Sequence, residues 1–68
     1  MLFTECAEVA CGMPYLPRGS TFDNAVKYVR SVMPDESYTV VDNVAAILCV
    51  QSRDYHEMVE QYNESGKD

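Results

Sequence analysis

The sequence predicts a small α+β domain with the element order helix, helix, β-hairpin, helix (ααββα). Three observations lead to this class. Apolar residues recur at helical spacing in three stretches, two short runs rich in β-branched residues lie between the second and third stretch, and turn residues separate the runs. A chain of 68 residues forms one domain, which we expect over 1–64 with a frayed tail over 65–68.

The first helix is predicted over residues 2–11. Leu2, Cys6 and Val9 recur at spacings of four and three, which places them on one helical face. Thr4 is the candidate cap at its start, and Gly12 is a suitable stop signal. The segment TECAEVAC also fits a half-buried strand, so the strand stays open as an alternative.

The second helix is the clearest in the chain. The stretch Ser20-Thr21-Phe22-Asp23 fits the pattern that caps a helix start. Pro34 ends the helix, because the residue before a proline avoids helical angles. Apolar residues between these signals fall on one face at i, i+3, i+4, i+7, i+10 and i+11: Phe22, Ala25, Val26, Val29, Val32 and Met33.

The residues SYTVVD (37–42) and VAAILCV (44–50) are predicted to pair as a β-hairpin. Both are rich in β-branched residues, and Asp42-Asn43 is suited to the turn. Because VAAILCV is apolar on both faces and its edges are open, it needs cover. The cover can come from the chain's own helices, from a second copy that extends the sheet to four strands, or from another protein. We expect the homodimer, with Ile47, Leu48 and Cys49 at the sheet interface.

A third helix is predicted to follow Ser52, its candidate cap. Tyr55, Met58, Val59 and Tyr62 fall at i, i+3, i+4 and i+7, so the two tyrosines are expected in the core. On the rest of this helix, three acidic residues form a line with no basic partner at helical spacing: Glu57, Glu60 and Glu64.

Candidate contact residues come from the loop MPYLPRGS (13–20), the polar side of the second helix and the hairpin. Two prolines limit the freedom of the loop. Tyrosine and arginine are residue types that protein interfaces favour. The candidates are Tyr15, Leu16, Arg18, Tyr28, Arg30 and Tyr38. The alternative for Tyr15 and Leu16 is that they fold back over the core.

The residues that suggest chemistry do not form a recognisable catalytic or metal site. Cys6, Cys11 or Cys49 with His56 has the residue types of a nucleophilic pair, but Cys49 lies in an apolar run, which raises the pKa of a thiol. The same four residues are zinc ligands by type, but their spacing is poor. We therefore expect no enzyme activity, no metal and no cofactor.

The net charge of −6 disfavours binding to nucleic acid or to an anionic membrane, and it suits a partner with a basic surface. Three cysteines, no basic N-terminal signal pattern and no apolar run of about 20 residues predict a cytoplasmic protein with free thiols.

The stretch TFDNAVKYVRSVMPDESYTVVDN (21–43) resembles, in layout, small phage-encoded proteins that bind and disable host machinery, of the anti-CRISPR and polymerase-inhibitor type. The likeness lies in the Thr-Phe-Asp start, the amphipathic helix, the proline-ended turn and the SYTVV strand. It implies a host-cytoplasmic inhibitor that acts by steric block, and it assigns no role to any single residue.

Together these observations predict a non-enzymatic protein-interaction module that inhibits or adapts another protein. The alternative is an acidic nucleic-acid mimic, in which Glu57, Glu60 and Glu64 occupy a basic groove. A third and less favoured class is a small metal-binding or thiol domain.

Overall fold

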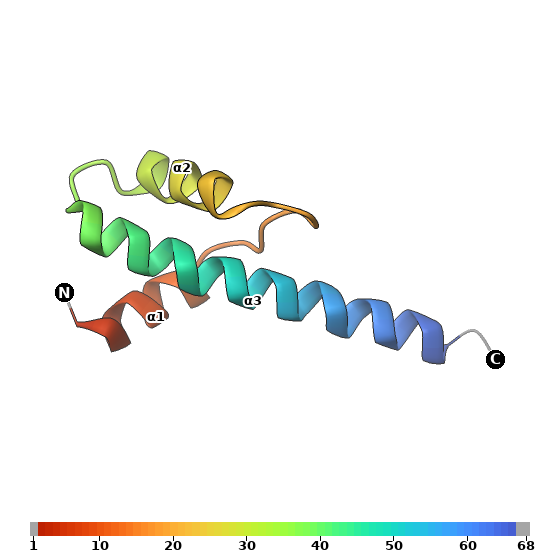
Figure 1. The fold of residues 1–68 in the computed structure, drawn as a ribbon. Coiled ribbons are helices and arrows are strands. Elements are labelled where there is room, and N and C mark those ends of the chain that lie inside the picture. Colours follow the sequence, from red (N-terminus) through yellow and green to blue (C-terminus); the bar gives the residue numbers. More distant parts are fainter. Residues whose placement is uncertain (1, 67–68) are drawn as a thin grey trace.

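The computed structural model describes residues 2–66, which form three α-helices (Figure 1). They are α1 (Phe3–Cys11), α2 (Phe22–Val32) and α3 (Tyr38–Ser65). No β-strand occurs among these residues, so the predicted α+β class and its hairpin are wrong, and the fold is all-α. Of the expected tail, Ser65 ends α3 and Gly66 caps it, while 67–68 lie outside the described residues, as does residue 1.

The stretch predicted as a hairpin and a third helix is one continuous helix of 28 residues. Ser37 opens α3 by accepting a hydrogen bond from the Val40 amide at 3.3 Å. No glycine or proline interrupts the chain from Ser37 to Ser65, so nothing in the backbone stops the helix. At 1.5 Å per residue α3 is about 42 Å long. No helix in the described range is both long and apolar enough to cross a membrane.

The hairpin prediction fails because a helix accommodates the same residues with a different periodicity. Asp42, expected in the turn, lies on the exposed side of α3 and needs no turn. Val40, Val41 and Val44 recur at helical spacing and are buried. Ser52, expected as a helix cap, is a buried residue inside α3. The strand on which the resemblance to phage inhibitors partly rests is therefore helical.

The two short helices are confirmed, with one difference at their ends. Thr21 caps α2 by accepting a hydrogen bond from the Asn24 amide, and α2 ends just before Met33, ahead of Pro34. α1 ends at Gly12 as predicted. Its N-cap is Leu2, which makes no side-chain cap bond, so the expected role of Thr4 is wrong.

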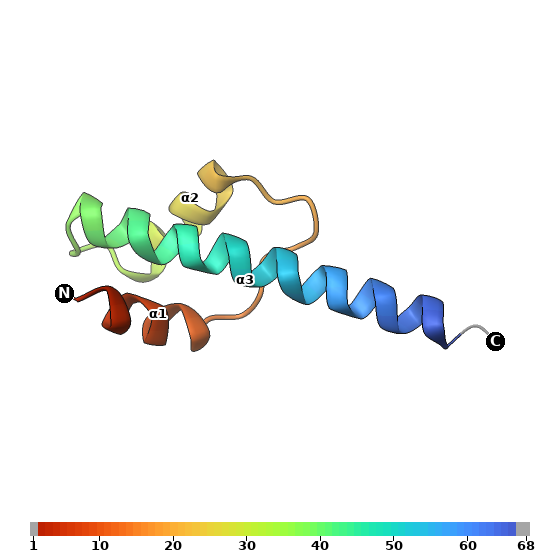
Figure 2. The ribbon, with the colours of Figure 1, turned by 60° about the horizontal axis from the view of Figure 1, so that its bottom comes forward.

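The three helices form a single layer. α1 and α2 pack on opposite flanks of the N-terminal half of α3, and within residues 2–66 they do not pack on each other (Figures 1 and 2). The molecule measures 49 × 21 × 13 Å, so its thinnest dimension is close to that of one helix, about 10–12 Å. The C-terminal half of α3 extends beyond both flanking helices (Figure 2).

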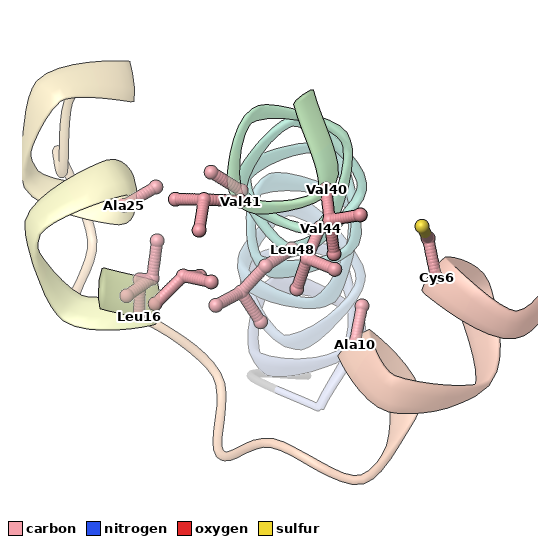
Figure 3. Packing of buried hydrophobic residues seen from close by; sticks show 10 residues of the cluster. Cys6, Ala10, Leu16, Ala25, Val40, Val41, Val44 and Leu48 are labelled. Atoms are coloured by element: carbon pink, nitrogen blue, oxygen red, sulfur yellow. The ribbon is translucent and has the colours of Figure 1, made fainter. Parts of the chain in front are cut away.

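The core lies along the two seams between α3 and its neighbours (Figure 3). Cys6 and Ala10 of α1 lie on one side of α3, while Leu16 and Ala25 lie on the other (Figure 3). Cys6, Ala10 and Ala25 are small, which allows α1 and α2 to approach α3 closely. The buried side chains that α3 supplies are Val40, Val41, Val44, Ala45 and Leu48.

The apolar run VAAILCV is therefore covered mainly by the chain's own helices. Leu48 is fully buried, and Ile47 and Cys49 are half-buried in contact with the core. Since these residues are helical, the expected four-stranded sheet across a dimer is wrong, and so is the sheet interface assigned to them. A side of this run remains open, because Ala46 and Val50 are exposed.

Candidate functional site

The loop between α1 and α2 is fastened to the middle of α3. The Leu16 amide donates a hydrogen bond to Ser52 Oγ at 2.9 Å, and His56 Nε2 donates to the Leu16 carbonyl at 2.7 Å. The Leu16 side chain is buried in the core. Leu16 therefore folds back over the core, which was the alternative to its role as a contact residue, and its side chain is not available to a partner.

Two exposed side chains of this loop also bind α3. The Tyr15 and Tyr55 rings stack with centroids 4.2 Å apart and an angle of 8° between their planes. Arg18 forms an ion pair with Glu60 at 2.9 Å. These contacts join residues about 40 positions apart in the chain, which sequence periodicity cannot reveal.

The other predicted contact residues lie in a separate place. Arg30 of α2 lies over the Tyr38 ring, with its guanidinium carbon 4.5 Å from the centroid, at the opposite end of α3 from Glu60. Tyr28 is half-buried and packs against the core. The six residues therefore do not form one surface.

A cleft of about 400 Å³ lies between the loop and α3. Its lining combines apolar surface with charged and polar side chains: Arg18, Ser20, Ser52, Arg53, His56, Glu57 and Glu60, together with Leu16, Pro17 and Cys49. Opposite charges face one another here, and the Arg18–Glu60 pair neutralises part of the cleft. Within residues 2–66, no three His, Cys, Asp or Glu side chains lie close enough together to hold a metal ion.

An uncovered apolar surface lies on the C-terminal half of α3. Tyr55, Met58, Val59 and Tyr62, here called the α3 stripe, are exposed by 39%, 66%, 37% and 77%. The tyrosines expected in the core are therefore at the surface, because α1 ends beside Tyr55 and Met58 and the C-terminal half of α3 extends beyond both short helices (Figure 2). Helical periodicity predicted Tyr55 and Tyr62 in the core, and the structure places them at the surface.

The α3 stripe continues the buried seam without a break. Val41, Ala45, Leu48, Ser52, Tyr55, Val59 and Tyr62 follow one another at alternating spacings of four and three. This is the a/d pattern by which one helix packs against another. The first four positions are buried under the chain's own elements, and the last three are open to solvent.

The acidic residues form a face that meets the stripe at Val59, which lines a hollow together with Glu60 and Glu64. Glu57, Glu60 and Glu64 follow at spacings of three and four, which places them together on the opposite side of α3 from Tyr55 and Tyr62. All three are exposed, but Glu60 is paired with Arg18. The predicted acidic line is therefore present as a face, with its central charge partly neutralised.

A second apolar hollow, of about 390 Å³, lies between α1 and α3. Its lining residues are Phe3, Ala7, Ala46, Ile47, Val50 and Gln51. It is shallow, and Phe3 at its rim is largely exposed.

No family model matches this chain, and neither a curated protein nor a solved structure matches it. The geometry of the α3 stripe and of the fastened loop is therefore the ground for a functional assignment.

Proposed function

We propose that this chain is a non-catalytic protein-interaction module, and that the α3 stripe is its contact surface. The observation that carries the proposal is the continuation of the a/d seam past the end of the chain's own cover. Folding of a lone chain accounts for Tyr55, which stacks on Tyr15, but it gives no reason for Met58 and Tyr62 at positions that stay open to water. A second polypeptide packed on the stripe does give such a reason.

The composition of the stripe supports the proposal. Tyrosine and methionine are enriched at the centres of protein interfaces, because they bring large apolar area with few rotatable bonds or with adaptable shape. Tyr15 extends the surface, since it is about half exposed while it stacks on Tyr55. The surface is carried on a regular helix, which fixes the relative positions of its side chains.

An inhibitor or an adaptor needs no more than such a surface. A projecting amphipathic helix can occupy a groove on another protein and block or bridge it without any chemistry. The acidic mimic has weaker support, because the ion pair between Arg18 and Glu60 lowers the charge at the centre of the acidic face.

Site-specific photo-crosslinking tests the proposal. The amino acid p-benzoylphenylalanine is placed at position 62 in the full chain, and separately at position 38. Tyr62 and Tyr38 are matched in exposure, at 77% and 72%, but Tyr38 lies outside the stripe. We expect a defined adduct from position 62 in a cell lysate and none from position 38. Equal labelling from both positions, or no adduct from either, would contradict the proposal.

A further inference from the structure

We infer that the occupant of the α3 stripe is a second copy of this chain, with the two α3 helices antiparallel. The inference rests on the proposed function, because it names the partner of the same surface. Three features carry it: the amount of exposed surface of the chain, the charges around the stripe, and the place where the chain's own cover ends.

The exposed surface exceeds what a compact monomer needs. The accessible surface is 4924 Å², whereas a folded chain of 7.7 kDa exposes about 4,300 Å². The surplus of roughly 600 Å² lies at the lower end of the ~600–1,000 Å² that each partner buries in a specific interface. The radius of gyration, 13.5 Å, is likewise above the ~11 Å expected for a compact chain of this length.

The charges around the stripe permit self-association. The side chains of the stripe carry no charge, and the residues beside them are neutral or carry charges of both signs. Asp54 lines a hollow with Tyr55 and Met58, and Arg18, Glu60 and Glu64 line another with Val59. A chain of net charge −6 would repel its copy if acids alone ringed the contact. The mixed border, in which Arg18 pairs with Glu60, limits this repulsion.

The elements that cover the N-terminal half of α3 favour an antiparallel orientation of the two α3 helices. On the stripe side of α3, that cover extends to the Leu16–Ser52 contact and the Tyr15 ring over Tyr55. Two parallel helices would place both sets of flanking helices at the same end, where they would collide, because the buried seam that these helices cover continues directly into the stripe. In an antiparallel pair each free half of α3 lies against the free half of its partner, and the flanking helices lie at opposite ends.

Sedimentation equilibrium of the purified full chain over a wide concentration range is the first test. We expect a reversible monomer–dimer equilibrium with species at 7.7 kDa and at twice that mass. Tyr62→Ser and Met58→Ser should each raise the dissociation constant at least tenfold, because every substitution removes the side chain twice per dimer. Tyr38→Ser, the matched control, should change it by less than threefold.

The salt dependence separates a second copy from a basic partner. Because the net charges of two copies repel and the stripe itself carries no charge, raising NaCl from 50 to 500 mM should leave the dimer unchanged or tighten it. Tenfold weakening with salt would overturn the inference. So would a strictly monomeric wild-type chain, or equal effects of Tyr62→Ser and Tyr38→Ser.

A spin-label distance tests the orientation. The label is attached to Tyr38→Cys in a background with Cys11→Ser and Cys49→Ser, and electron double resonance reads the separation between copies. Antiparallel pairing about the stripe puts the two labels about 55–70 Å apart, from 1.5 Å per residue along each helix. A distance below about 40 Å would indicate parallel helices and overturn the orientation.

The crosslinking experiment distinguishes failure of this inference from failure of the proposed function. If position 62 reacts with a different protein and the purified chain is monomeric, self-pairing is wrong and the interaction module stands. If position 62 forms no adduct and the chain is monomeric, both are wrong. An adduct of two copies of this chain supports both.

Discussion

The Leu16 amide and the Ser52 hydroxyl, 36 residues apart in sequence, meet in a buried hydrogen bond of 2.9 Å. This bond sets where the first loop crosses α3. It also explains a serine at a position of the a/d seam that otherwise carries mainly apolar residues. A buried backbone amide needs an acceptor, and the side chain of Ser52 supplies it.

Ser52→Ala should therefore destabilise the fold more than its size suggests. The substitution leaves the Leu16 amide buried without a partner, which costs about 1–3 kcal/mol. Urea unfolding followed by circular dichroism measures the change. Ser31→Ala is the control, since Ser31 is exposed on α2 and bonds only the nearby Tyr28 carbonyl. Equal unfolding free energies for the two variants would show that the buried bond contributes nothing.

Leu48→Ala tests the core. Leu48 is the largest of the fully buried side chains. Its truncation removes apolar contacts and leaves a cavity, which should lower the free energy of unfolding by about 2–5 kcal/mol. That range is comparable with the whole stability of a small domain. We expect loss of cooperative thermal unfolding, or a much lower melting temperature. Val50→Ala, two positions away but exposed, should change stability by less than about 1 kcal/mol. Similar losses at both positions would contradict the packing.

The same substitution, glycine to alanine, should change the stability in opposite directions at Gly19 and at Gly12. Gly19 has a φ of 84°, which L side chains rarely adopt, so Gly19→Ala should destabilise by about 1–2 kcal/mol although a Cβ would meet nothing within 4 Å. Gly12 has a φ of −83°, and a Cβ there would make an ordinary contact at 3.5 Å. Gly12→Ala should therefore stabilise by about 0.4–1 kcal/mol through the unfolded chain. Thermal denaturation of the two variants measures the changes in melting temperature. Shifts in the same direction would contradict the prediction.

The Arg18–Glu60 ion pair should contribute little to stability. Both side chains are substantially exposed, so solvent screens the attraction, and the coupling energy should be below about 1 kcal/mol. A double-mutant cycle with Arg18→Ala and Glu60→Ala measures it, and the coupling should fall as salt rises from 50 to 500 mM. A coupling that salt leaves unchanged would mean that the pair is shielded from solvent.

The sequence predicted the parts of the fold that local signals determine. Thr21 and Pro34 bound α2, and Gly12 ends α1, because capping and helix termination depend on neighbouring residues. The hairpin was wrong because valines and the Asp42-Asn43 pair favour strands and turns only weakly, and tertiary packing overrides them. The lack of any glycine or proline from Ser37 to Ser65 was the signal that favoured one long helix.

The candidate site was harder to predict, because it depends on how far α1, α2 and the loop between them extend along α3. The periodicity of Tyr55 and Tyr62 correctly places both on one helical face, but it does not show what lies over that face. Nine residues of α1 and eleven of α2 are too short to cover a helix of 28. Lengths of neighbouring elements and long-range contacts such as Arg18–Glu60 follow from the whole chain, not from a local pattern.

The separation of α1 from α2 has a consequence for how the molecule opens. In the described part of the chain each short helix is anchored to α3 alone, so one can detach while the other stays in place. Amide hydrogens of α1 and α2 should then exchange with solvent through independent local openings, at different rates. The slowest exchange should belong to the N-terminal half of α3, around Val44 and Leu48, because both short helices must leave before those amides are released.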